Sequence, residues 1–240
     1  MTANIVHPGG AAADALPDHP FYPLGIALPG YIANEMSTIR ILGIFAATCV
    51  AVGLPTLVVI NRTRPDLKKR EVSTAMWFVL CGCIHLILEG YFAFNAVATS
   101  RHILAEMWKE YSLSDSRYLT RDAFVVSMET VTSVCWGPLS FLCAWCIVAD
   151  HPARHVLQAV ISLGQIYGDV LYYGTCTLEY VVRALEFSRP EPYYFYGYYV
   201  FLNAIWIVIP SMLLWSSCKK ITRAFARVQQ LEATKNGKVH

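Results

Sequence analysis

Long apolar runs alternate with short polar connectors along most of this chain. A helix rises 1.5 Å per residue, so a run of about 20 apolar residues crosses the hydrocarbon of a bilayer. Runs of this kind are expected at residues 39–60, 74–98, 123–149, 153–175 and 193–217. The pattern therefore predicts an all-α polytopic membrane protein, built as a bundle of five transmembrane helices.

The same pattern divides the chain into three parts. Residues 1–38 form a lead-in rich in Pro, Gly and Ala, and at least residues 1–17 are expected to be disordered. Residues 39–217 form the five-helix membrane domain, and residues 218–240 form a basic tail.

Two connectors inside the membrane domain are longer than the others. Residues 176–192 are expected to form a loop. Residues 99–122 contain apolar side chains at helical spacing, which predicts a short interfacial helix. These side chains are Ile103, Leu104, Met107, Trp108 and Tyr111.

The composition supports insertion into a membrane. Apolar residues make up 55% of the 240 residues and charged residues 15%, whereas soluble domains carry about 25% charge. The mean hydropathy is +0.42. No basic run with interleaved aromatic residues accompanies the net charge of +2, so no nucleic-acid partner is expected. The first apolar run, rather than a cleaved signal peptide, is expected to direct insertion.

Lysine and arginine are distributed unevenly between the two sides of the predicted bundle. The segment through Arg40, residues 99–122 and residues 176–192 carry 7 of them in total. The first connector, the turn before the fourth run and the tail carry 12. The positive-inside rule therefore predicts a lumenal N-terminus and a cytoplasmic C-terminus.

The second apolar run carries two ionisable side chains well inside its ends. His85 and Glu89 are four residues apart, so they share one face of the predicted helix. A carboxylate in hydrocarbon is strongly unfavourable unless it is paired or lines a polar cavity. Partners are therefore expected on the other runs.

Polar side chains on other runs fall at a similar depth. Measured from the expected helix ends, Glu89 and Glu129 lie about 12 and 9 Å below one membrane face, and Asn203 and Trp206 about 15 and 20 Å. These groups could line one cavity, or they could form a hydrogen-bond network that only joins the helices. The cavity is the favoured interpretation for the acids and His85, because ionisable residues are a costly way to join helices.

The fourth run carries a polar stripe of its own. Ser162, Gln165 and Asp169 lie on one face of the predicted helix, at a depth similar to that of the acids. Uncharged or singly charged groups of this kind commonly form hydrogen bonds between helices. Helix packing is therefore the favoured interpretation of this stripe.

Two carboxylates and an imidazole are suited to moving protons, because one group can donate while another accepts. Trp206 adds a π face that could stabilise a cation, or it could simply pack in the bilayer. No second histidine joins His85 in the second run, so no metal site is expected. Cys143 and Cys146 have C-x-x-C spacing but no second ligand pair, and this indicates helix packing.

Five stretches occur in order along the chain: HLILEGYF, WKEYSLSDSRY, METVTSVCWGPLS, SLGQIYGDVLYY and NAIWIVIPS. Together they cover about residues 74–215 and resemble the emopamil-binding protein family of sterol Δ8–Δ7 isomerases. The resemblance implies a five-helix membrane enzyme that moves a ring double bond from C8=C9 to C7=C8. A proton is added at C9, a carbocation forms at C8, and a proton leaves C7. Neither a redox cofactor nor a metal is implied.

The resemblance also implies a set of functional residues. The catalytic positions are His85, Glu89 and Glu129, and the substrate-binding positions are Thr132, Asn203, Trp206, Tyr111, Asp115, Arg117 and Tyr118. The last four match the EY…DSRY segment and are expected to close or order one mouth of the cavity. The acids and His85 would shuttle the two protons, while Asn203 and Thr132 would orient them.

The implied substrate is a Δ8-sterol, handled in the endoplasmic reticulum membrane during sterol biosynthesis. Lipophilic cationic amines would imitate the carbocation and act as inhibitors. The oligomeric state, including a homodimer, stays open. Two other functions fit the buried acids: a sterol- or amine-binding protein without catalysis, and a proton-coupled carrier. The chain lacks the inverted repeat that many carriers have.

Overall fold

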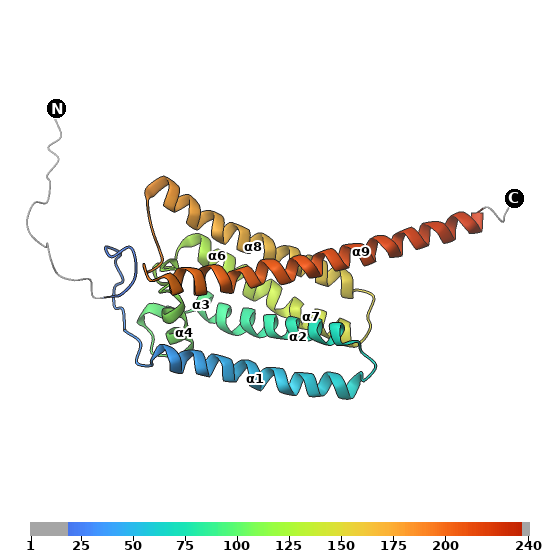
Figure 1. Ribbon diagram of the computed structural model, residues 1–240, viewed down its shortest axis with the longest axis horizontal. Helices are drawn as coiled ribbons and strands as arrows, with labels where there is room; N and C mark the ends of the chain where they lie inside the picture. Colours follow the sequence, from blue (N-terminus) through green and yellow to red (C-terminus); the bar gives the residue numbers. More distant parts are fainter. Residues whose placement is uncertain (1–18, 237–240) are drawn as a thin grey trace, which may run out of the picture.

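Helical segments follow the predicted apolar runs closely (Figure 1). The computed structural model describes residues 19–236, so the residues expected to be disordered lie outside the described range. The α-helices are α1 (Thr38–Thr63), α2 (Lys69–Cys83), α3 (Gly90–Phe94), α4 (Ile103–Tyr111), α5 (Arg117–Thr120), α6 (Ala123–Val131), α7 (Gly137–Val148), α8 (Arg154–Arg183) and α9 (Asn203–Asn236). They are joined in places by the π-helical segments η1 (Ile84–Glu89), η3 (Thr132–Trp136) and η4 (Tyr193–Leu202) and by the 3₁₀ turn η2 (Val97–Thr99). No strand occurs in this part of the chain, which confirms the all-α class.

Four of the five predicted spans are long and apolar enough to cross a membrane. Among the described residues these are Thr38–Thr63, Lys69–Phe94, Ala123–Val148 and Tyr193–Lys235. The prediction of five is therefore one too many by length and composition. The exception is the run at 153–175, which forms a helix but is not apolar enough to count as a span. Its polar side chains Ser162, Gln165 and Asp169 are buried in the bundle.

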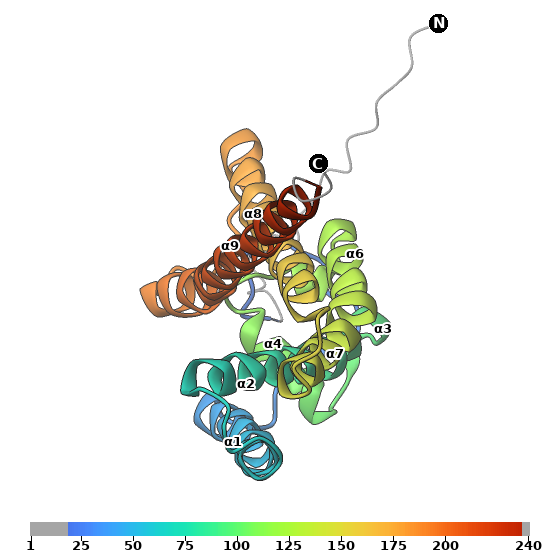
Figure 2. The same ribbon diagram turned by 90° about the vertical axis from the view of Figure 1, so that its right-hand side faces the viewer.

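Helix α8 is also longer than expected. It continues to Arg183, so the prediction of a loop over 176–192 is wrong for the first half of that segment. No Gly or Pro occurs between Gly174 and Ala184, and Ala184 ends the helix with a left-handed backbone conformation at φ 53°. The 30 residues of α8 give a length of about 45 Å. The helix thus runs the length of the bundle beside α9 (Figures 1 and 2).

The long helices pack in sequence around the bundle. Helix α1 packs on α2, α2 on α7, α7 on α8, and α8 on α9. Figure 2, a view along the bundle, shows α1 and α2 on one side and α8 and α9 on the other. One apolar core, around Phe92, Trp108 and Tyr172, lies at the α4 end. A second core, around Phe78 and Ile161, lies toward the other end.

The two cysteines of the C-x-x-C pair lie in the interior. Cys143 belongs to the second core. Cys146, three residues later on α7, is also buried. Both are free thiols. Their burial in an apolar environment supports the interpretation that they pack between helices.

The predicted interfacial helix forms, as α4, but it is buried rather than lying on a surface. Its Lys109 Nζ donates hydrogen bonds of 2.9 Å to the carbonyl oxygens of Ile32 and Ser100. One turn earlier, the Glu106 carboxylate accepts hydrogen bonds from the backbone N–H groups of Glu35 and Met36. These bonds fasten the lead-in to α4 and place α4 across one end of the bundle.

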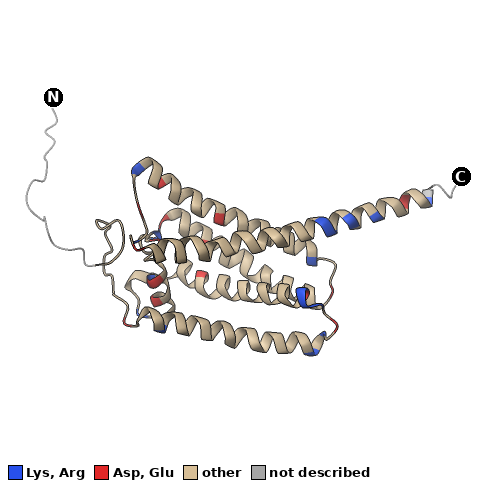
Figure 3. Ribbon diagram, in the orientation of Figure 1, with Lys and Arg blue, Asp and Glu red and all other residues tan. Residues whose placement is uncertain are grey.

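Basic side chains gather at the opposite end. Figure 3 shows Lys and Arg where α1 connects to α2 and where α7 connects to α8, and along the part of α9 that projects from the bundle. The acidic residues inside the bundle are few. The two ends of the molecule therefore differ in charge as the sequence pattern predicts.

Candidate active site

A cavity of about 420 Å³ lies inside the bundle. Helices α1, α2, α4, α5, α6, α8 and α9 and the π-helical segments η1, η3 and η4 contribute to its wall. Eight of the ten sequence-predicted site residues line it: His85, Glu89, Tyr111, Tyr118, Glu129, Thr132, Asn203 and Trp206. The polar groups that the depth argument placed in one band thus meet around a single space.

His85 and Glu89 lie on the π-helical segment η1, which continues α2 toward α3. Their side chains share a face, and His85 Nδ1 lies 2.7 Å from Glu89 Oε2. His85 is 1% exposed. Its other ring nitrogen, Nε2, lies 3.0 Å from the amide nitrogen of Gln165 on α8.

These contacts indicate the tautomer of a neutral imidazole. An amide nitrogen can only donate, so His85 Nε2 accepts the hydrogen bond from Gln165. The ring proton of neutral His85 is then on Nδ1 and is donated to Glu89. His85 therefore holds the Glu89 carboxylate in one orientation at the cavity wall.

Glu129 on α6 supplies the second carboxylate. Its Oε1 accepts a hydrogen bond of 2.8 Å from the Tyr118 hydroxyl, and the residue is 5% exposed. Tyr118 is itself stacked on Trp108, with ring centroids 4.7 Å apart. Glu129 and Glu89 both line the cavity. Two helices thus place two carboxylates at the same cavity.

Thr132 and Asn203 line the cavity and form their hydrogen bonds with groups other than the two carboxylates. The Thr132 hydroxyl donates to the Met128 carbonyl on its own helix, at 2.9 Å. The Asn203 amide donates to the Tyr111 hydroxyl at 2.9 Å and to the Tyr199 carbonyl at 2.6 Å. In this structure Asn203 orients Tyr111 rather than an acid.

Two indole rings line the cavity on the side toward the basic end. The rings of Trp77 and Trp206 are tilted by 50°, with centroids 5.4 Å apart. Both indole N–H groups are buried and have no hydrogen-bond partner among the described residues. The negative π faces of such rings attract cations.

Asp115 and Arg117 differ from the other predicted residues because they do not line the cavity. They form a buried ion pair, with 2.6 Å between Arg117 Nη2 and Asp115 Oδ2. The guanidinium also donates to the Thr175 hydroxyl and lies 4.8 Å from the centroid of the Tyr172 ring. The pair thus fixes α5 against α8 and supports Tyr172, a wall residue, from behind.

Several wall residues were not predicted as site residues. Gln165, Asp169, Tyr172, Trp77 and Trp136 all line the cavity. The stripe on the fourth run was the available signal for Gln165 and Asp169. Gln165 does form a hydrogen bond between helices, as the packing interpretation expects, and both residues also line the cavity. Trp77 and Trp136 are single aromatic residues in apolar runs, a pattern that bilayer-facing residues share.

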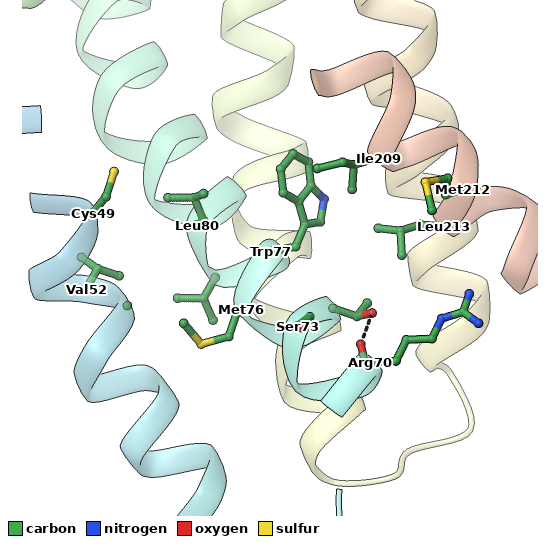
Figure 4. Close-up of a pocket in the computed structure, with 13 residues that line it drawn as sticks. Cys49, Val52, Arg70, Ser73, Met76, Trp77, Leu80, Ile209, Met212 and Leu213 are labelled. Atoms are coloured by element: carbon green, nitrogen blue, oxygen red, sulfur yellow. Dashed lines mark hydrogen bonds between the residues drawn. The ribbon is translucent and has the colours of Figure 1, made fainter. Parts of the chain in front are cut away.

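A groove of about 500 Å³ continues from the cavity toward the basic end. Cys49, Trp77 and Leu80 belong to the walls of both spaces. Figure 4 shows Val52 of α1, Met76 of α2 and Ile209, Met212 and Leu213 of α9 around the groove, with Arg70 at its end. The cavity and the groove thus adjoin along the bundle through shared wall residues, and the groove beyond the indoles is largely apolar.

Comparison with known proteins places this architecture among described relatives. The family model for EBP, described as EXPERA (EXPanded EBP superfamily), matches residues 103–217. The 3-beta-hydroxysteroid-Delta(8),Delta(7)-isomerase of Mus musculus is 39% identical over 214 residues, covering 88% of this chain and 92% of the relative. A probable isomerase of the same name from Arabidopsis thaliana is 37% identical, covering 92% and 96%. The protoglabretal synthase of Citrus sinensis is 37% identical, covering 70% and 79%.

Proposed function

The chain belongs to the EBP family of the EXPERA superfamily, and from this we propose that it is a membrane-bound 3-beta-hydroxysteroid-Δ8,Δ7-isomerase. The reaction moves the ring double bond of a sterol from C8=C9 to C7=C8. The sterol isomerases match a larger share of both chains than the protoglabretal synthase does, which favours a sterol as the substrate.

The observation that carries the proposal is the pair of carboxylates, Glu89 and Glu129, at one largely apolar cavity. Each is held by one neighbour, His85 or Tyr118. Protonating an unactivated double bond needs an acid held close to carbon, and removing a ring proton needs a base across from it. The wall supplies both kinds of group.

The reaction proceeds in two steps that leave the sterol's composition unchanged. One carboxylic acid of the pair gives its proton to C9, and the C8=C9 π electrons form the new C–H bond, which leaves a cation at C8. The other group, as a carboxylate, removes a proton from C7, and those C–H electrons form C7=C8. The proton then returns from the second group to the first.

The intermediate carries a positive charge in a place with little water. The carboxylates offer negative charge, and Trp206 with Trp77 offers π faces. Lipophilic ammonium compounds combine a similar charge with an apolar body. They are therefore expected to bind the same cavity and to inhibit the enzyme.

The decisive experiment is product analysis in a strain lacking its own Δ8–Δ7 isomerase. Membranes containing this protein should convert a Δ8-sterol into the Δ7 product. Glu89→Gln and Glu129→Gln should each lower kcat by about 100- to 10,000-fold, because each removes one participant in proton transfer. If both variants kept full activity, the assignment of the proton transfer to these acids would be wrong. Binding of sterol without any turnover by the unaltered protein would instead indicate a non-catalytic binding protein.

A further inference from the structure

Glu110 is a further acid at the cavity wall, and it takes no part in the proposed proton transfer. It lies on α4, lines the wall and is 6% exposed. No Lys, Arg or His forms an ion pair with it among residues 19–236. Burial raises the pKa of this carboxyl, while hydrogen bonds from Thr38 and Tyr198 lower it. Burying a carboxylate without a counter-charge is energetically unfavourable, so a function for Glu110 is worth seeking.

A neighbouring acid on the same helix shows what a purely structural role looks like. Glu106, one turn earlier, is also buried, but both of its oxygens accept backbone N–H groups of the lead-in. It does not line the cavity. Glu110 has only side-chain partners within the described part of the chain, and it faces the space where the substrate would lie.

The two hydrogen bonds to Glu110 leave some acceptor sites of its carboxylate free. Thr38 Oγ1 donates to one carboxylate oxygen at 3.2 Å, and the Tyr198 hydroxyl donates to the other at 3.3 Å. Both bonds are longer than the usual 2.5–3.0 Å or so for hydroxyl donors. A carboxylate has about four acceptor sites, so a ligand hydroxyl could be added.

The order of polar and apolar groups along the cavity, with Glu110 at one end, matches the order of groups along a sterol. Its partner Thr38 is the first residue of α1, and the same helix lines the cavity as far as Cys49, 11 residues or about 16 Å away. From Glu110 toward the basic end, the helices bring first the two candidate catalytic acids and then the two indoles to the cavity wall, and the apolar groove adjoins the cavity there. A sterol likewise has a hydroxyl at one end, rings in the middle and an alkyl tail at the other end.

We propose that Glu110, together with Tyr198, binds the 3β-hydroxyl of the substrate and so points the sterol tail toward Trp77 and the groove. The inference rests on the proposed function and adds the orientation of the substrate. The alcohol donates its proton to the carboxylate, and the Tyr198 hydroxyl then donates to the alcohol oxygen instead of to Glu110. Glu110 acts as a binding residue, because it fixes where C8 and C9 lie without exchanging protons with them.

The test compares a 3β-hydroxy Δ8-sterol with its 3-deoxy analogue. Glu110→Met should lower kcat/KM for the hydroxy sterol by about 10- to 100-fold, the worth of a hydrogen bond to a charged group, chiefly through KM. Glu110→Gln, which keeps an acceptor, should recover part of the loss. Tyr198→Phe should act in the same direction. The 3-deoxy sterol should be used equally well by all four proteins, because it has no hydroxyl to lose.

Glu106→Gln is the matched control, since its carboxylate binds the lead-in rather than the cavity. It should affect both sterols equally. Equal losses on both sterols in Glu110→Met and Tyr198→Phe would overturn the proposal and make Glu110 a structural residue. Loss of affinity for cationic amines alone would also overturn it.

Sterol binding, measured by quenching of tryptophan fluorescence, keeps this test separate from the proposed function. Absence of turnover in the unaltered protein would count against the isomerase. The preference for the hydroxy sterol over the 3-deoxy sterol, and its loss in Glu110→Met and Tyr198→Phe, would still decide the role of Glu110.

Discussion

At the scale of single residues, each candidate catalytic acid has one neighbour that fixes its direction. Glu89 receives a hydrogen bond from His85, and His85 is held in turn by Gln165 on another helix. A chain of three polar side chains therefore joins η1 to α8. Because the imidazole is buried, loss of the Gln165 contact would leave its Nε2 unpaired and let the ring turn away from Glu89.

Replacing Gln165 tests this chain of contacts. Gln165→Met keeps the length of the side chain and removes the amide, so kcat should fall about tenfold, with a smaller change in KM. Steady-state turnover of a Δ8-sterol is the measurement. Ser162→Ala is a suitable control, because Ser162 is buried on the same helix but does not line the cavity. Unchanged kcat in Gln165→Met would show that His85 needs no support from α8.

Sequence reasoning reached some of these residues and not others. His85 and Glu89 could be paired because helical periodicity alone brings residues four apart together. Gln165 contacts His85 across 80 positions of sequence, so its partner depends on how α8 packs. Glu110 appeared in the sequence as one acid of a polar connector. Only the fold separates it from Glu106, because it places Glu110 at the cavity wall and Glu106 against the lead-in.

At the scale of elements, π-helical segments lie at the cavity. The segments η1 and η3 carry or flank His85, Glu89 and Thr132, and η4 leads into Asn203. An extra residue per turn changes which side chains face inward, and such turns are frequent at functional sites. The sequence signals of a π turn are weak, so helices of ordinary geometry were expected here. The spans themselves were predictable because length and apolar composition determine them.

A glycine sets how closely α8 approaches η3. A Cβ atom at Gly164 would lie 2.4 Å from the ring of Trp136, which lines the cavity. Gly164→Ala should therefore lower the free energy of unfolding, by about 1–3 kcal/mol for overpacking, and raise the KM for sterol. Melting in detergent and sterol titration are the measurements.

Gly174 is the matched control for this substitution. It lies on the same helix, and a Cβ atom there would have no described neighbour within 4 Å, so Gly174→Ala meets no obstacle. It should leave KM unchanged and stabilise the helix by up to about 1 kcal/mol. If the two variants behaved alike, close packing against Trp136 would not be what shapes this part of the wall.

At the scale of the whole molecule, the sequence pattern and the structure differ in the number of helices that qualify as membrane spans. Four helices qualify as spans, while α8 runs the length of the bundle with a buried polar face. Composition alone could not show where the polar side chains of α8 lie, since a helix that lines a polar cavity can turn these side chains away from lipid. The basic end follows from the sequence, whereas the continuation of α9 through the tail to Asn236 was not predicted (Figure 3).

The orientation of the bundle can be tested by glycosylation. We propose that the lead-in faces the lumen of the endoplasmic reticulum and that the end of α9 faces the cytoplasm, because the basic end should remain cytoplasmic. An N-glycosylation acceptor placed in the lead-in should be modified, whereas one placed at the C-terminus should not. An acceptor in the connector between α1 and α2 provides the cytoplasmic control. Modification of the C-terminal acceptor would reverse the assignment.

The groove between α1, α2 and α9 has a consequence for how the protein meets its substrate. Its walls are apolar almost to Arg70, so we expect a sterol to reach the cavity by exchange with neighbouring lipids rather than from water (Figure 4). The quantity that governs occupancy is then the mole fraction of sterol in the bilayer. Adding phospholipid at constant total sterol slows the reaction by surface dilution, even though the bulk concentration stays the same. The membrane thus acts as the solvent in which the apparent affinity is defined.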